Sequence, residues 1–371
     1  MPKKKYVRFS LYKAVLSLTD NHADKLLKAD QRIAELEAIA PQDFKSHHGL
    51  SLDKWRDHRR ELAEAAARRQ TTWQLSQVIE AAQNGRIPEM VLKVNGEKIE
   101  MDRNAYFHKD SSPHLYSFQI AKLRATGLPA KKKIDEARED IPLAEDEYIG
   151  EFTEILLDTR YGVVIIQSNK YGVGVSAVQK YLNFLQKQYL EINRQPVNRY
   201  LVGELQPILD EGLTERALAA DCYKKVRIRC SDVNKDGIIP EDSVHLSSVA
   251  RIIGEQTGVT LDVCLTVKRE DAAGTLTARD VRSVARKYRE FMAAPTTTDE
   301  DKKDARVEVT ILNPQTNVLE AIDLLTPKVD FLVPIEVEER QPIGSEYLYD
   351  LTAEQYSRLD ARLFAILGGL Q

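Results

Sequence analysis

Four arginines in the second half of the chain recur at helical spacing, and their side chains are well suited to binding anions. They are three, four and three positions apart, which places them in one narrow sector of a helix predicted over residues 277–292. Guanidinium groups on one face repel one another unless anions neutralise them, and their planar forks fit phosphate oxygens. The sequence predicts a phosphate-binding stripe, with a solvated basic face as the alternative. The stripe consists of Arg279, Arg282, Arg286 and Arg289.

A second basic group lies on a strand predicted over residues 224–230 of the same half. Strand alternation places Lys225, Arg227 and Arg229 on one face, and Lys268 and Arg269 end the next predicted strand. If both strands share a sheet, these groups would line one surface together with the arginine helix. Such a surface would hold double-stranded DNA through charge, without reading its sequence.

Two short motifs resemble ligand-binding loops and fall short of them. Residues 232–237 match the start of a calcium-binding loop, but the position that requires glutamate is Ser243. We therefore predict a turn there. Gly172 and Gly174 precede a predicted helix, yet the third glycine of a dinucleotide fold and the lysine of a P-loop are both missing. This segment is predicted to be a plain strand-to-helix turn.

The sequence predicts no catalytic residue, no metal site and no cofactor. Its seven histidines and three cysteines show no zinc-site spacing, and no nucleophile motif is present. One alternative is a metal-dependent nuclease, in which Asp158, Asp262 and Glu336 would meet around a metal ion. Another is a non-catalytic protein-interaction scaffold, suggested by an exposed helix over residues 51–83.

The strand and helix patterns around these residues predict an α+β fold with two domains. Residues 1–192 would form an N-terminal domain with a helical insertion at about 20–84, and residues 193–371 a C-terminal domain carrying the basic surface. The first half shows strand patterns at 6–18, 151–157 and 163–167, a hairpin at Asn95-Gly96, and helical spacing at 21–39, 51–83 and 176–189. The second half predicts strand–helix–strand–helix–strand–strand–strand–helix. We expect mixed β-sheets with helices packed on one face.

Composition is that of a globular protein. The hydrophobic fraction of 43% and the charged fraction of 30% argue against disorder, and 371 residues suffice for two cores. No apolar run is long enough to span a bilayer, and the first residues lack the apolar region of a secretory signal. We therefore expect a cytoplasmic protein.

Several of these segments together resemble the RexA-like phage-exclusion proteins and the KwaB-like anti-phage defence family. The likeness runs from about Glu89 to the C-terminus, and the helices over 21–83 have no counterpart in it. It implies a homodimeric, cytoplasmic DNA-binding sensor of phage infection that works with a separate membrane protein. It transfers no catalytic residue, and it makes the two basic groups the expected DNA-binding residues. The segments that carry it are 162–167 with the following turn and helix, 225–230, 261–263, 278–288 and 307–324.

Overall fold

The chain forms two compact units, and its α+β class is confirmed. Unit 1 comprises residues 1–207 and 330–371, and unit 2 comprises residues 208–329. The computed structural model describes residues 3–19, 22–38, 49–132, 134–135, 137–231, 238–239, 260–268, 274–295, 305–312, 319–324, 327–338 and 342–368.

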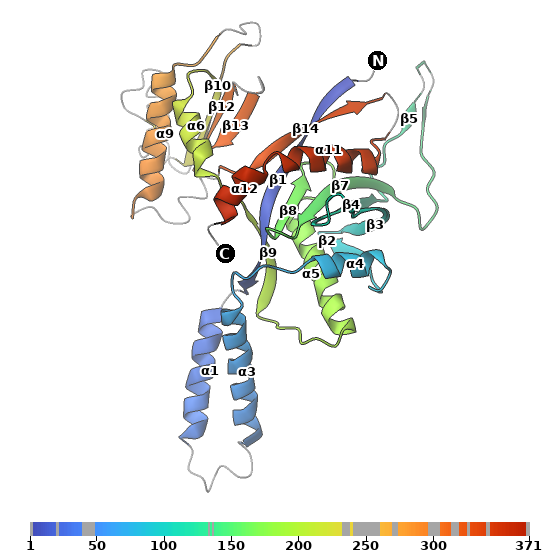
Figure 1. The fold of residues 1–371 in the computed structure, drawn as a ribbon, viewed down its shortest axis with the longest axis vertical. Helices are drawn as coiled ribbons and strands as arrows, with labels where there is room; N and C mark the ends of the chain where they lie inside the picture. Colours follow the sequence, from blue (N-terminus) through green and yellow to red (C-terminus); the bar gives the residue numbers. More distant parts are fainter. Residues whose placement is uncertain are drawn as a thin grey trace. The chain divides into compact units, whose positions relative to one another are not determined.

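An eight-stranded sheet forms the centre of unit 1 (Figure 1). Its path is β14-β1-β8-β7-β4-β3-β2, with β9 paired to the second half of β1, and all described pairings are antiparallel. The strands are β1 (Lys3–Leu18), β2 (Leu92–Val94), β3 (Glu97–Phe107), β4 (Leu115–Arg124), β7 (Ile149–Asp158), β8 (Val163–Gln167), β9 (Leu201–Pro207) and β14 (Asp330–Val337). A separate ribbon joins β5 (Lys131–Lys132) to β6 (Arg138–Glu139).

The predicted hairpins are present. Asn95 and Gly96 join β2 to β3 with φ angles of 50° and 87°, as a type I′ turn requires. Strands β7 and β8 pair as the second hairpin, and Gly162 takes a φ of 62° in the turn between them. Local turn chemistry therefore sets the register of this part of the sheet.

Helices cover both faces of the unit 1 sheet. On one face lie α4 (Ser76–Gln83) and α5 (Val175–Ile192), which pack Val78, Ile79, Leu182 and other apolar side chains against alternate strand residues. Within this core the Tyr181 hydroxyl donates to the Met90 carbonyl oxygen at 2.7 Å. On the other face lie α11 (Ser345–Ser357) and α12 (Asp360–Leu367), with α11 contacting β3, β4 and β14.

The expected division between residues 192 and 193 differs from the observed units. Strand β14 pairs with β1 over eight residues, from Lys3 opposite Val337 to Ser10 opposite Asp330. Because this pairing joins the C-terminal segment to the first strand, residues 330–371 belong to unit 1. A sheet partner more than 300 residues away leaves no local signal in the sequence.

The helical insertion is an antiparallel pair, α1 (His22–Glu37) and α3 (Gly49–Ala67). The single helix expected over 51–83 breaks between α3 and α4, where Gln70 has a φ of 62°. There Thr72 pairs with Val15 of β1, and the Trp73 backbone N–H donates to the Ala14 carbonyl oxygen at 3.0 Å. Pairing with the sheet thus replaces helical hydrogen bonds, and α4 belongs to the sheet core instead of the insertion.

The described part of unit 2 is a four-stranded antiparallel sheet with two helices, α6 and α9. The sheet order is β11-β10-β12-β13. The elements are α6 (Glu211–Ala219), β10 (Tyr223–Ser231), β11 (Thr260–Thr266), α9 (Ala278–Ala293), β12 (Arg306–Leu312) and β13 (Leu319–Asp323). The turn expected at 232–237 and a helix expected at 243–254 lie outside the described residues. No described helix is long and apolar enough to cross a membrane.

Candidate nucleic-acid interface

Helix α9 carries the arginine stripe and attaches to the unit 2 sheet by its opposite side. Val281, Val284, Ala285 and Tyr288 are buried against the apolar face of the sheet and against α6. The Tyr288 hydroxyl donates to the Ala305 carbonyl oxygen at 3.2 Å. The predicted helix and its predicted apolar side are therefore present, and the stripe lies on the α6 side and the solvent side of α9.

Arg282 contributes to the packing of α9 on α6. Its Nη2 donates to the Ala220 carbonyl oxygen at 2.8 Å and to the Asp221 carboxylate at 3.1 Å. Ala220 is the C-cap residue of α6, and a cation there satisfies a terminal carbonyl and complements the helix dipole. Arg282 therefore has a structural role that is independent of any ligand.

Arg289 is exposed and paired, whereas the other two exposed residues of the stripe make no ion pair with a described residue. Arg289 Nη1 lies 3.0 Å from Glu215 of α6. Arg279 and Arg286 are exposed, and among the described residues neither makes an ion pair. These two arginines are cations of α9 with which no described carboxylate pairs; Lys287 is a third, and its Nζ donates to the Ile239 carbonyl oxygen at 2.8 Å.

A hollow lies beside the stripe. It has a volume of about 410 Å³ and is lined by Leu218, Arg282, Arg286, Arg289 and Glu290. Arg282 and Arg289 at this depression are already bonded to Ala220 and Glu215, whereas Arg286 has no ion-pair partner among the described residues. A guanidinium without such a partner can donate paired hydrogen bonds to phosphate oxygens, so the depression favours an oxyanion over a neutral ligand. The geometry thus supplies one concave basic site on unit 2.

The basic group on β10 lies on the other face of the sheet. Buried Val226, Ile228 and Cys230 face the helices, so the alternating Lys225, Arg227 and Arg229 face away from them. The expectation that the strand and α9 would share a surface is corrected by this arrangement, because the sheet lies between them. Of the remaining basic residues, Lys268 is exposed and Arg269 lies outside the described residues.

Carboxylates on neighbouring strands neutralise much of the β10 group. Arg227 donates to both oxygens of Asp262 on β11, at 2.9 and 2.5 Å, and this bidentate bond holds the pKa of Asp262 below its ordinary value. Lys225 lies 3.8 Å from Glu308 on β12. Arg229 lies between Asp262 and Arg306 in the pairing register. Basic and acidic side chains are thus interspersed on this face, with Arg229 opposite Arg306 as a like-charged pair, and the ion pairs suit cross-strand stabilisation better than anion binding.

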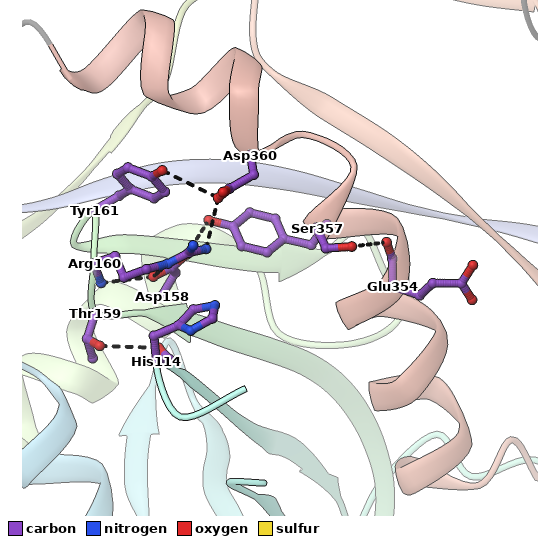
Figure 2. A network of polar contacts seen from close by, with 9 residues as sticks. His114, Asp158, Thr159, Arg160, Tyr161, Glu354, Ser357 and Asp360 are labelled. Atoms are coloured by element: carbon purple, nitrogen blue, oxygen red, sulfur yellow. Dashed lines mark hydrogen bonds and ion pairs between the residues drawn. The ribbon is translucent and has the colours of Figure 1, made fainter. Parts of the chain in front are cut away.

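The carboxylates of the nuclease alternative are not gathered in one place within either unit. Asp262 is in unit 2, whereas Asp158 and Glu336 are on separate strands of unit 1. No group of three or more His, Cys, Asp or Glu side chains in the described part of the chain is placed to hold a metal ion. Asp158 is instead the centre of a different network, drawn in Figure 2.

That network joins the β7–β8 turn to the C-terminal helices. Arg160 Nη2 lies 2.8 Å from Asp158 and 3.0 Å from Asp360 at the start of α12, and Figure 2 shows the guanidinium between the two carboxylates. The Tyr356 hydroxyl of α11 donates to Asp158 at 3.0 Å. Burial, followed by the Asp158 charge, raises the pKa of Tyr356. Asp158 is fully buried and fully partnered, so it holds α11 and α12 in place.

The partners of the arginine stripe were missed because α6 was not predicted. A signal for this helix is present in the sequence: Asp210 is the N-cap, and its side chain accepts a hydrogen bond from the Gly212 backbone N–H at 2.8 Å. Leu213 and Ala217, four positions apart, form its buried side. With α6 recognised, Glu215 would have been a candidate partner for a basic helix.

A family model, described as a family of unknown function (DUF6731), matches residues 56–362. This range covers most of the chain. The chain belongs to the DUF6731 family. The DUF6731 match begins within α3 and ends within α12, so it includes both the arginine stripe and the Asp158 network. No curated protein matches the chain significantly.

Proposed function

We propose that the chain is a non-catalytic DNA-binding protein that contacts the phosphate backbone through α9 without reading sequence. The observation that carries the proposal is the exposed pair Arg279 and Arg286 on a helix whose other arginines line one basic hollow. Backbone contacts of this kind position a protein on DNA and make its affinity depend on salt. The β10 group is assigned to sheet stability because its charges are largely paired.

The biological setting of the proposal rests on the resemblance to RexA-like and KwaB-like proteins. In that setting the chain acts in the cytoplasm as a homodimer, senses phage infection by binding double-stranded DNA, and works with a separate membrane protein. The geometry of α9 supports the DNA contact alone. The dimer, the sensing role and the membrane partner are therefore tested separately from DNA binding.

The experiment is a titration of an arbitrary fluorescent DNA duplex with the full chain at several salt concentrations, read by anisotropy. The double variant Arg279→Gln, Arg286→Gln should weaken binding at low salt and reduce the slope of log K against log salt by about 2, one for each lost phosphate contact. Arg282 and Arg289 are left intact, because their substitution would also disturb α6.

The matched control changes two arginines on the opposite face of the same sheet. Arg227→Gln with Arg229→Gln removes the same charge, and we expect the DNA affinity and the salt slope to stay near those of the unmodified chain. If the control pair weakens binding and the α9 pair does not, the assignment to α9 is wrong. If the unmodified chain binds no duplex at low salt, DNA binding itself is rejected and a scaffold role is favoured.

A further inference from the structure

The α1–α3 helical pair joins the unit 1 sheet at a cluster of rings around Tyr200. This residue precedes β9, and its side chain is only 5% exposed because it packs with Leu62 of α3 in a small core. The rings of His22 on α1 and His58 on α3 meet it edge to face, at centroid distances of 6.4 and 5.4 Å. His22 Nε2 also donates to the Leu62 carbonyl oxygen at 2.8 Å. The whole cluster belongs to unit 1, so it is independent of the DNA contact proposed on α9.

His58 makes the polar connection between α3 and the segment before β9. Its Nδ1 atom lies 2.8 Å from the Tyr200 hydroxyl oxygen and 3.0 Å from Arg199 Nη2. A guanidinium group can only donate hydrogen bonds, so Nδ1 carries no proton and accepts from both partners. The connection therefore requires a neutral His58 ring with its proton on Nε2.

Most of the charged groups around His58 oppose a positive charge on its ring. Arg199 is in hydrogen-bond contact, and Lys25 Nζ of α1 lies 5.5 Å from the centroid of the adjoining Tyr200 ring. Glu61 on α3 favours the charge, but it lies 3.3 Å from Arg199 and already pairs with it. Burial, followed by the Arg199 charge, outweighs Glu61 and holds the pKa of His58 below its ordinary value of 6.5.

Acid would break this connection. A proton on Nδ1 would point at the N–H groups of Arg199, and two cations in contact repel each other. Because folding lowers the pKa of His58, the stabilising contribution of its neutral ring is present above a pH of about 6.5. It is lost as the pH falls through the lower pKa of the folded chain. The base of the helical pair should therefore weaken in mild acid.

We propose that the base of the α1–α3 pair is an acid-sensitive junction. Protonation of His58 ends its bond to Arg199 and detaches α3 from the segment before β9. The helical pair then unfolds locally, because it has a small core of its own, while the sheet keeps its structure. The Asn198 Nδ2 bond to the Glu61 carbonyl oxygen, at 3.0 Å, joins groups that do not titrate and acts as a tether at either pH.

The test compares the full chain at about pH 7.5 and about pH 5.5, the range in which a histidine changes charge. Hydrogen exchange is expressed as protection factors, which removes the intrinsic pH dependence of exchange. We expect protection in α1 and α3 to fall about fivefold in acid, the factor that corresponds to one lost hydrogen bond, and protection in β7 and β8 not to fall. An NMR titration of the seven histidine rings should show that His58 titrates below its ordinary pKa.

Two variants separate His58 from other effects of acid. His58→Asn can place an amide oxygen where Nδ1 accepts, and this oxygen does not titrate, so protection in α1 and α3 should stay constant over the same range. Arg199→Gln removes the adjacent cation, and the pKa of His58 should rise toward its ordinary value. The matched control is His114→Asn, which removes a histidine outside the helical pair and should respond to acid as the unmodified chain does.

Three results would overturn the proposal. In the first, acid leaves the protection of α1 and α3 unchanged in the unmodified chain. In the second, the His58→Asn variant loses protection as the unmodified chain does. In the third, the helical pair and the sheet lose protection together, which would mean that acid acts on the whole of unit 1 instead of on the junction.

Discussion

The Glu154 carboxylate is buried in the unit 1 sheet without a cation beside it among the described residues. Its side chain on β7 is 1% exposed, and it accepts hydrogen bonds from the Ser117 hydroxyl and from Gln119 Nε2, the latter at 2.8 Å. Burial raises its pKa to about 7 from an ordinary value of 4.5, although both hydrogen bonds oppose this. The folded state therefore holds the proton more tightly than the unfolded chain does.

This difference makes stability depend on pH. The contribution of protonated Glu154 is fully present below a pH of about 4.5 and is lost as the pH rises through about 7. The loss is roughly 3 kcal/mol. Glu154→Gln should remove it, so the free energy of unfolding should differ less between about pH 5 and about pH 8 in the variant, as urea titrations would measure. An unchanged pH dependence would contradict the raised pKa.

Substitutions in the Asp158 network should destabilise the protein to different degrees, according to how deeply each group is buried. Asp158→Asn removes the buried negative charge and replaces one of the two oxygens that accept from Arg160 and Tyr356 by an NH2 group. It should lower the free energy of unfolding by about 2–3 kcal/mol, less than for a fully buried pair because Arg160 is partly exposed. Tyr356→Phe removes one hydrogen bond and should cost about 1 kcal/mol.

Asp360→Asn provides the exposed comparison, because its side chain is 46% exposed, and it should cost less than ~1 kcal/mol. Urea unfolding of the three variants should reproduce this order. An equal loss for Asp158→Asn and Asp360→Asn would mean that burial does not strengthen the network.

At the scale of elements, we expect the α1–α3 helical pair to unfold locally while the sheet of unit 1 stays folded. Leu62 of α3 is fully buried with Ala29, Ala65 and Tyr200 in a small core separate from the main one. Leu62→Ala should destabilise this core by about 3 kcal/mol and speed hydrogen exchange in α1 and α3 about a hundredfold. Exchange in β1, β7 and β8 should not change. Leu27→Ala on α1, at a 59% exposed position, is the control and should leave exchange in the pair unaltered.

The arginines of the α9 stripe should differ in their contribution to stability, because some of them bond to α6 and others do not. Arg282→Gln removes the hydrogen bond to the C-cap carbonyl of α6 and should lower the melting temperature of unit 2. Arg286→Gln should stay within ~0.5 kcal/mol of the unmodified chain. Thermal melting of both variants measures the difference. Equal melting temperatures would show that Arg282 does not support α6.

Local signals in the sequence were enough for β1, for the Asn95-Gly96 hairpin, for the β7–β8 pair and for α9. Each depends on residues within one element and its turn. The end of α3 was not predictable in the same way, because it is decided by the pairing of Thr72 with Val15, a residue of β1 that is distant in sequence. The basic pattern of β10 was also misleading, since its acidic partners Asp262 and Glu308 lie on other strands.

At the scale of the whole molecule, unit 2 is an insertion in the sequence of unit 1, between the end of β9 and the start of β14. Its two ends lie side by side: the Val329 N–H donates to the Ile208 carbonyl oxygen, and the Asp210 N–H to the Pro327 carbonyl oxygen, both at 2.9 Å. A short linker joining residue 207 to residue 330 can therefore replace it. We expect this shortened chain to keep a cooperative melting transition.

The excised unit 2, residues 208–329, should also fold, since it contains its own buried core. Circular dichroism and thermal melting of the two proteins measure both outcomes. A shortened chain without a cooperative transition would show that unit 1 depends on the insert.

The pairing of β14 with β1 also determines the order in which the chain can fold as it leaves the ribosome. Unit 2 is continuous in sequence and is complete at residue 329, whereas unit 1 waits for its last strand and for α11 and α12. Domains fold as units during synthesis, so unit 2 should form first. Until α11 and α12 emerge, one face of the unit 1 sheet, with Leu11, Leu156 and Ile165 among its buried residues, would be uncovered. This nascent sheet is where we expect chaperones to act.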